Sequence, residues 1–301
     1  MSSPFEVMYH VITPIFLVVG AAALVGSRFD PDARTISTLV IYLFNPCLIV
    51  QGIATSDLRG DEIMRIMGAI VLLSAAMIPV GYGFSRFYKL DRREESAFML
   101  TAVLMNAANY GIPFNTFAFG EEGRTRAIMV YLASAILSNT VGVYLASRGH
   151  LSSKQALVNV FRVPLPYAAA LGFYLKLSGQ GLPETLGRSV DLLADATVPC
   201  MLVLLGFQLV RLSFRERVQP VLAAASARLL ISPLIAVLLT ALLGLSGVTR
   251  DVVIVQAGMP SAVLSGALAA EFGSDAKFAT ATILLSTLGS IITLSILVSL
   301  L

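Results

Sequence analysis

The sequence predicts an all-helical polytopic membrane protein in which ten transmembrane helices form two inverted five-helix repeats. Three observations lead to this prediction. Hydrophobic residues make up 56% of the 301 residues, whereas charged residues make up 13%, about half their share in soluble domains. The apolar residues form ten blocks of about 20, the length that crosses a bilayer as a helix. Short motifs from the first half of the chain also return in the second half.

The helices follow from the apolar blocks between charged or Gly/Pro-rich stretches. The first block has no basic leader and is therefore expected to be a mature span, not a signal peptide. The predicted spans are residues 8–24, 35–55, 63–87, 96–119, 125–147, 155–177, 189–210, 218–243, 251–271 and 277–299. They divide into a first repeat, residues 1–150, and a second, residues 151–301.

Lysine and arginine residues next to the spans predict the orientation. Seven lie on the side that holds both termini and thirteen on the other side, and the remaining one of the 21, Arg228, falls inside span eight. By the positive-inside rule the side with thirteen faces the cytoplasm. The protein is therefore expected in the cell membrane with both termini outside.

The repeat rests on motifs that recur in the same order at a nearly constant offset. The recurring pairs are residues 46–50 with 199–203 and Phe119-Gly120 with Phe272-Gly273, both offset by 153, and Gly111-Ile112-Pro113 with Gly258-Met259-Pro260, offset by 147. Because each half contains an odd number of spans, the second half enters the membrane from the opposite side. Inverted repeats of this kind are typical of secondary transporters.

Spans four and nine each contain a Gly-x-Pro motif that predicts a helix break inside the membrane, at Gly111–Pro113 and at Gly258–Pro260. Proline removes a helical hydrogen bond and clashes with the carbonyl four residues before it, and glycine adds backbone freedom. Lipid cannot satisfy the freed backbone groups, so they have to face a protein cavity or a ligand. Paired breaks in the two repeats indicate a transport site.

Neutral polar side chains surround both breaks, and each half-helix that follows a proline starts with a partial positive charge. This combination suits a bound carboxylate, although two ordinary kinked helices are the alternative interpretation. The candidate substrate-binding residues are Asn106, Asn109, Tyr110, Gly111, Pro113, Asn115, Gln256, Gly258, Met259, Pro260, Ser261 and Arg228.

Two roles stay open for Arg228, which is expected near the middle of span eight. It is a counter-charge for an anionic substrate or a buried carboxylate, in which case Arg228→Ala abolishes uptake and leaves expression intact. Alternatively it reaches the cytoplasmic surface or caps the carbonyls of a half-helix. Asp191 and Asp195 are expected at the interface, in solvent, with a proton relay as the alternative if Asp195 is buried.

The composition argues against other classes of protein. The 21 basic residues barely exceed the 18 acidic ones, so a nucleic-acid partner is not expected. Cys47 and Cys200 are repeat equivalents that we expect to be packing residues, and no His/Cys/Asp cluster predicts a zinc site. No P-loop or G-x-S-x-G motif is present. We therefore expect that the protein is not an enzyme and binds no cofactor. Whether transport is coupled to Na⁺ or H⁺ stays open.

The motifs resemble those of the auxin efflux carrier family, whose bacterial members are often called malate or malonate permeases. The resemblance covers the whole chain. It rests on Met259-Pro260-Ser261-Ala262 followed by Ala269 and Phe272-Gly273, on Asn109-x-Gly111-x-Pro113, on Asn45-Pro46, on Arg228-Leu229-Leu230 followed by Pro233, and on Ser286-Thr287-Leu288.

The resemblance implies a fold similar to bile acid symporters and sodium/proton antiporters. Spans 1, 2, 6 and 7 would form a scaffold, which mediates homodimerisation in relatives. Spans 3–5 and 8–10 would form a mobile transport domain whose broken helices cross at Pro113 and Pro260. The implied function is secondary transport of a small organic anion, a mono- or dicarboxylate or an auxin-like acid, by elevator-type alternating access. Auxin itself is not assigned, because the long central loop of the plant carriers is missing.

Two other functions stay open. A sodium- or proton-coupled symporter of the bile acid type would bind substrate in a Na⁺-dependent way. A membrane receptor or sensor would bind an organic anion without carrying it into proteoliposomes. The expected partners are the substrate, the lipid bilayer and a second copy of the chain.

Overall fold

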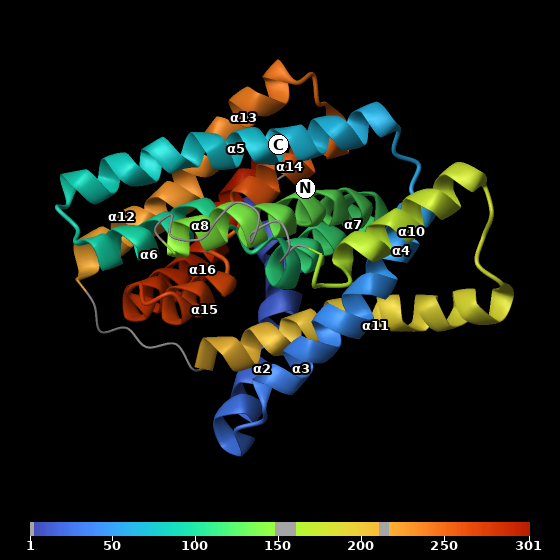
Figure 1. Ribbon diagram of the computed structural model, residues 1–301, viewed down its shortest axis with the longest axis horizontal. Helices are drawn as coiled ribbons and strands as arrows, with labels where there is room; N and C mark the ends of the chain where they lie inside the picture. Colours follow the sequence, from blue (N-terminus) through green and yellow to red (C-terminus); the bar gives the residue numbers. More distant parts are fainter. Residues whose placement is uncertain (1–2, 148–160, 211–216) are drawn as a thin grey trace.

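The computed structural model describes residues 3–147, 161–210 and 217–301. The predicted start of span six at residue 155 and the basic residues Arg148, Lys154, Arg211 and Arg215 lie outside these ranges. Within them every regular element is a helix (Figure 1), apart from one isolated antiparallel pairing described below. Seven helices of the described residues are long and apolar enough to cross a membrane.

The elements of the first half follow the predicted spans closely, with η marking a π-helical turn. In chain order they are α1 (Pro4–Val7), η1 (Met8–Ile12), α2 (Thr13–Phe29), α3 (Ala33–Leu39), η2 (Val40–Phe44), α4 (Asn45–Ala54), α5 (Gly60–Phe87), α6 (Arg92–Val103), η3 (Ala107–Gly111), α7 (Ile112–Leu137), η4 (Ser138–Gly142) and α8 (Val143–Ala146). Gly120 leaves the helical region inside α7, with φ 64° and ψ −153°. Glycine tolerates this positive φ, and the kink lies where spans four and five were predicted to meet.

The described elements of the second half are helices too. Its described elements are α10 (Leu165–Ser178), α11 (Glu184–Val210), α12 (Val218–Ser226), η5 (Ala227–Ile231), α13 (Ser232–Leu242), α14 (Gly247–Ala257), α15 (Leu264–Glu271) and α16 (Ala276–Ser299). Predicted spans four and nine are both discontinuous, since α6 is separated from η3 and α14 from α15. For this reason neither predicted span forms one of the seven long helices by itself.

Prolines explain most of the π-helical turns. Pro14, Pro46, Pro113 and Pro233 each stand two residues after the last residue of such a turn, in η1, η2, η3 and η5 respectively. A proline inside a helix has no N–H to donate and its ring crowds the carbonyl four residues earlier. One extra residue in the preceding turn relieves that conflict. The helix therefore bends at these prolines and continues.

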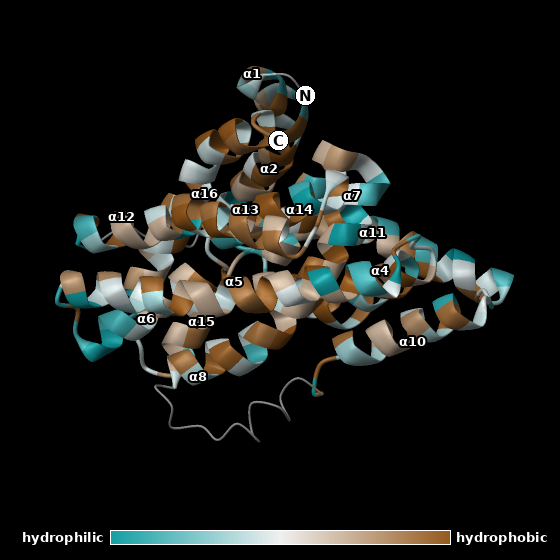
Figure 2. Cartoon of the chain, turned by 90° about the horizontal axis from the view of Figure 1, so that it is seen from above, coloured by the Kyte–Doolittle hydropathy of each residue, from teal (hydrophilic) through white to brown (hydrophobic). Residues whose placement is uncertain are grey.

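The helices pack into two groups that meet at η3–α7 and where α1 packs against α16. In the first group α11 packs against α2 and α4, and α10 against α4. In the second, α5 packs against α6 and α7, α14 against α7 and α13, and α16 against α12 and α15. Hydrophobic residues cover the lengths of the helices and hydrophilic ones gather toward their ends (Figure 2). The two chain ends lie close together in both views, where α1 packs against α16.

Candidate functional site

The two broken spans meet through their extended segments. Asn106 N–H donates to the carbonyl oxygen of Pro260 at 2.9 Å, and Ala262 N–H donates to that of Leu104 at 2.9 Å. These bonds make an antiparallel pairing between Met105 and Ser261. Four half-helices, α6, η3–α7, α14 and α15, therefore end or begin at one point inside the protein, as a crossing of broken helices requires.

The break in the second half lies where it was predicted, and the break in the first half does not. Helix α14 ends at Ala257, immediately before Gly258–Pro260. In the first half the non-helical residues are 104–106, and Gly111 and Pro113 belong to the helical stretch after them. The prediction placed this break too late in the sequence. The π-helical turn η3 accommodates the steric clash between the Pro113 ring and the preceding backbone, so the helix continues through Pro113. The crossing therefore lies at Asn106 and not at Pro113.

Side chains from the second half satisfy the carbonyls in the last turn of α6. A helix leaves its last four carbonyls without intrahelical donors, and inside a membrane each of them needs a partner. The donors are Ser265 Oγ to Leu100 at 3.2 Å, Ser261 Oγ to Thr101 at 2.8 Å, and Arg228 Nη1 to Ala102 at 3.3 Å and to Val103 at 3.2 Å. Ser261 and Arg228 thus hold the end of α6.

Arg228 also caps the second broken helix. Its Nη2 donates to the carbonyl of Ala257, the last residue of α14, and to Ser232 Oγ, which itself donates to Ala257 at 2.8 Å. The side chain is fully buried, and none of the ion pairs within the described residues includes it. A cation is well placed there, because the C-terminal ends of two helices carry partial negative charge. This geometry corresponds to the capping role left open by the sequence.

Gln256 packs tightly against η3, the helical turn that follows the break in the first half. Its Nε2 donates to the carbonyl of Ala107 at 3.4 Å, and its Oε1 is buried without a partner. A Cβ atom on Gly111 would overlap Gln256 Oε1 and lie 2.8 Å from Gln256 Cδ. Asn115 donates to the carbonyl of Gly111 at 2.7 Å, and its Oδ1 is likewise buried and unpartnered. Glycine at position 111 therefore lets the two broken spans approach each other.

Gly111→Ala is expected to destabilise the protein by about 1 kcal/mol, the lower end of the cost of overpacking a dense core, because the atoms that the new Cβ meets are the movable end of the Gln256 side chain. The physical reason is that Gln256 has to move away from α7. Thermal unfolding of the detergent-purified protein measures the effect. Gly68→Ala is the matched control, because nothing lies within 4 Å of a Cβ at that position in α5. An unchanged unfolding temperature in Gly111→Ala would contradict the proposed contact.

A cavity of about 440 Å³ opens beside the crossing, and we call it the central cavity. It is bordered by the first turn of η3, by the start of α15, and by α3–α4, α7–η4 and α11. Its polar lining residues are Ser37, Asn45, Asn106, Asn109, Tyr131, Ser134, Ser138, Asn139 and Gln208. Every polar lining residue within the described ranges is neutral. Asn106 and Asn109 are the two predicted site residues that line it.

Three amide groups at this cavity have a buried atom without a hydrogen-bond partner in the part of the chain that the structure describes: Asn45 Oδ1, Asn106 Nδ2 and Gln208 Oε1. The other amide atom of Asn45, Nδ2, lies 3.1 Å from the hydroxyl of Tyr131. Buried polar groups are normally paired, so these atoms are available to a ligand or water. Tyr131, Gln208 and Asn139 were missed from the sequence, where only their polarity within apolar spans distinguishes them.

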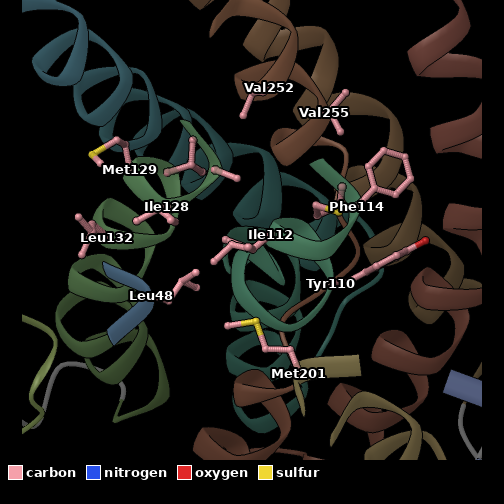
Figure 3. Close-up of a cluster of buried hydrophobic side chains, with 14 of the residues drawn as sticks. Leu48, Tyr110, Ile112, Phe114, Ile128, Met129, Leu132, Met201, Val252 and Val255 are labelled. Atoms are coloured by element: carbon pink, nitrogen blue, oxygen red, sulfur yellow. The ribbon is translucent and has the colours of Figure 1, made fainter. Parts of the chain in front are cut away.

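The remaining predicted site residues lie at the crossing and do not line the central cavity. They are Tyr110, Gly111, Pro113, Asn115, Gln256, Gly258, Met259, Pro260, Ser261 and Arg228. Tyr110 is fully buried and its hydroxyl lies 3.4 Å from Ser290 Oγ. Figure 3 shows that this hydroxyl is directed away from Leu48 and Ile128. A direct role of these residues in binding stays a prediction.

Comparison with known proteins identifies the family. A family model described as membrane transport protein matches residues 7–298. The chain belongs to this membrane transport protein family. The match confirms the resemblance to the auxin efflux carriers, and membership makes the chain a multi-pass membrane transporter. Two archaeal relatives, each named an uncharacterized transporter, are similar along most of their length. The protein of Methanothermobacter thermautotrophicus is 29% identical over 90% of both chains, and that of Methanocaldococcus jannaschii 26% identical over 97% of both.

Proposed function

We propose that the protein is a secondary carrier of small organic anions, mono- or dicarboxylates, that works by alternating access. The observation that carries the proposal is the neutral polar cavity next to the starts of two half-helices. Ala107 and Asn109 at the start of η3, and Val263 and Leu264 at the start of α15, border the same space. The partial positive charge at the start of each half-helix favours a carboxylate at such a place.

The chain crosses the membrane ten times in this proposal, as two inverted repeats, residues 1–150 and 151–301. Support comes from the matching position of the two breaks, each in the fourth of five predicted spans. Helices α1–α4, α10 and α11 form a scaffold, through which two copies associate. Helices α5–α8 and α12–α16 move as the transport domain, in an elevator-type motion. Both termini face the outside, in keeping with the distribution of basic residues.

Arg228 bears on the coupling of transport to ions. It supplies a fixed positive charge to the ends of α6 and α14, where broken-helix transporters are able to coordinate a cation through backbone carbonyls. The protein therefore works without Na⁺ and without a cofactor in the main proposal. A sodium- or proton-coupled symporter is the second candidate, favoured by the unpartnered buried oxygens of Asn115 and Gln256.

Uptake of radiolabelled carboxylates into proteoliposomes tests the proposal. We expect saturable uptake of at least one mono- or dicarboxylate, at the same rate when Na⁺ is replaced by choline and when the pH gradient is collapsed. Dependence on Na⁺ or on the gradient would establish the symporter instead. Binding detected by thermal shift without any uptake would favour a receptor, and neither binding nor uptake of any carboxylate would contradict the proposed substrate class.

A further inference from the structure

A second cavity, of about 430 Å³, lies at the other end of the helices that border the central cavity. Spans α3–α4, α7 and α11 contribute to both. The central cavity takes Asn45, Tyr131 and Leu204 from these spans, and the second cavity takes Gln51, Arg124 and Asp195. The two residues named on each span are six, seven and nine positions apart, in that order. Helix α4 runs antiparallel to α7 and α11, since Asn45 contacts Tyr131 at one end and Gln51 contacts Arg124 and Asp191 at the other. The cavities therefore open toward opposite ends of the bundle.

An apolar layer separates the two cavities. Leu48 of α4, Ile128 of α7 and Met201 of α11 are fully buried in one cluster (Figure 3). The Ile128 side chain of α7 packs directly on the backbone of α4, because a Cβ atom on Gly52 would overlap Ile128 Cδ1. The central cavity is thus sealed from the second cavity in this conformation.

Arg124 of α7 joins three helices at the second cavity. Its Nη2 donates to Gln51 Oε1 of α4 at 3.0 Å, and Gln51 Nε2 donates to Asp191 Oδ1 of α11 at 2.7 Å. Arg124 Nη1 also pairs with Glu121 at 3.1 Å, and Arg124 Nη2 lies 3.9 Å from Asp195. Arg124 and Asp191 fix the orientation of the Gln51 amide, whose oxygen faces the guanidinium group and whose nitrogen faces the carboxylate. Bonds to charged groups strengthen each other in such a chain.

The burial of this cluster is uneven. The Arg124 side chain is 12% exposed, whereas those of Glu121 and Asp195 are 76% and 70% exposed. The bond between Arg124 and Gln51 is therefore the most shielded part of the cluster, and it contributes more than an exposed ion pair. Hydrophilic residues are conspicuous where α4, α7 and α11 adjoin (Figure 2).

We propose that Arg124, Gln51 and Asp191 form a latch that holds the apolar layer closed, so that the central cavity is sealed from this end of the transporter while it is open at the other end. The inference rests on the proposed alternating access, because α7 belongs to the moving unit and α4 and α11 to the scaffold. Sliding of α7 along α4 breaks the bond between Arg124 and Gln51 and separates Ile128 from Gly52. Arg124 is a positioning residue in this role, and it does not contact the substrate.

Cysteine accessibility tests the latch. Leu48→Cys is made in a background of Cys47→Ser and Cys200→Ser, because Leu48 is buried in the apolar layer and lines neither cavity. The rate of its modification by a charged maleimide is measured in the purified protein. The cysteine is sealed while the latch holds. Arg124→Gln and, separately, Gln51→Ala are expected to raise the rate about tenfold, a change of about 1.4 kcal/mol in the equilibrium between closed and open.

Arg188→Gln is the matched control, because Arg188 pairs with Glu184 on the same helix, with both side chains 79% exposed. Its modification rate should equal that of the parent, and size-exclusion profiles show that each variant is folded. Equal rates in parent, Arg124→Gln and Gln51→Ala would overturn the latch, as would an equal increase in the control. The measurement needs no substrate, so absence of carboxylate uptake by the wild type would refute the proposed function and leave this result unaffected.

Discussion

Replacing Asn106 with aspartate is expected to abolish binding and uptake of organic anions and to leave the protein folded. Asn106 lines the central cavity and precedes the first residue of η3, at the N-cap position. Aspartate is also a favoured N-cap residue. Its carboxylate would accept the hydrogen bonds and occupy the positive helix end that we assign to the substrate, and it would repel a second anion. Proteoliposome uptake and ligand-induced thermal shift measure the loss.

Asn106→Ala separates this charge effect from the loss of a donor. The buried Nδ2 of Asn106 has no partner among the described residues, and a hydrogen bond to a carboxylate contributes about 1.5–3 kcal/mol. Substrate affinity should therefore fall about 10- to 150-fold. Asn139→Ala is the control at the same cavity, since Asn139 Nδ2 already donates to the carbonyl of Ala135. Wild-type affinity in Asn106→Asp would exclude the central cavity as the anion site.

Arg228→Ala is expected to destabilise the folded protein by about 2–6 kcal/mol, because it leaves two buried carbonyls, those of Ala102 and Val103, without their donor, at about 1–3 kcal/mol each. The carbonyl of Ala257 keeps its bond from Ser232. The variant should therefore accumulate poorly in membranes and unfold at a lower temperature in detergent. This result differs from that of a pure counter-charge role, in which expression stays intact.

Arg228→Lys retains the charge but donates through a single nitrogen, so it should recover part of the lost stability. Arg188→Ala removes an exposed arginine of α11 and is expected to have little effect. Normal expression and unfolding of Arg228→Ala together with complete loss of uptake would show that Arg228 acts on the substrate and not as a cap.

The extent of the helices was predictable from sequence because it depends on local composition. The break at Gly258–Pro260 was predictable for the same reason. The break at residues 104–106 was not, because the outcome at Pro113 depends on whether the helix ends or widens into a π-helical turn. That choice is made by tertiary contacts, such as the bond between Asn106 and Pro260.

The central cavity was harder to predict, since its walls come from distant parts of the chain. Asn45, Tyr131 and Gln208 share no local motif, and their contact with Asn106 around one space exists only after folding. The partners of Arg228 were equally hidden from sequence reasoning. A search for a carboxylate could not reveal them, because backbone carbonyls of two helices and a serine accept its bonds.

The crossing also constrains how the protein is made. Arg228 follows Val103 by 125 residues and Ser265 follows Leu100 by 165. When the first half leaves the ribosome and enters the membrane, the donors for the end of α6 have not yet been synthesised. Lipid supplies no substitute, and pairing over such sequence separations is slow. The end of α6 can therefore be capped only after the second repeat has been synthesised and inserted.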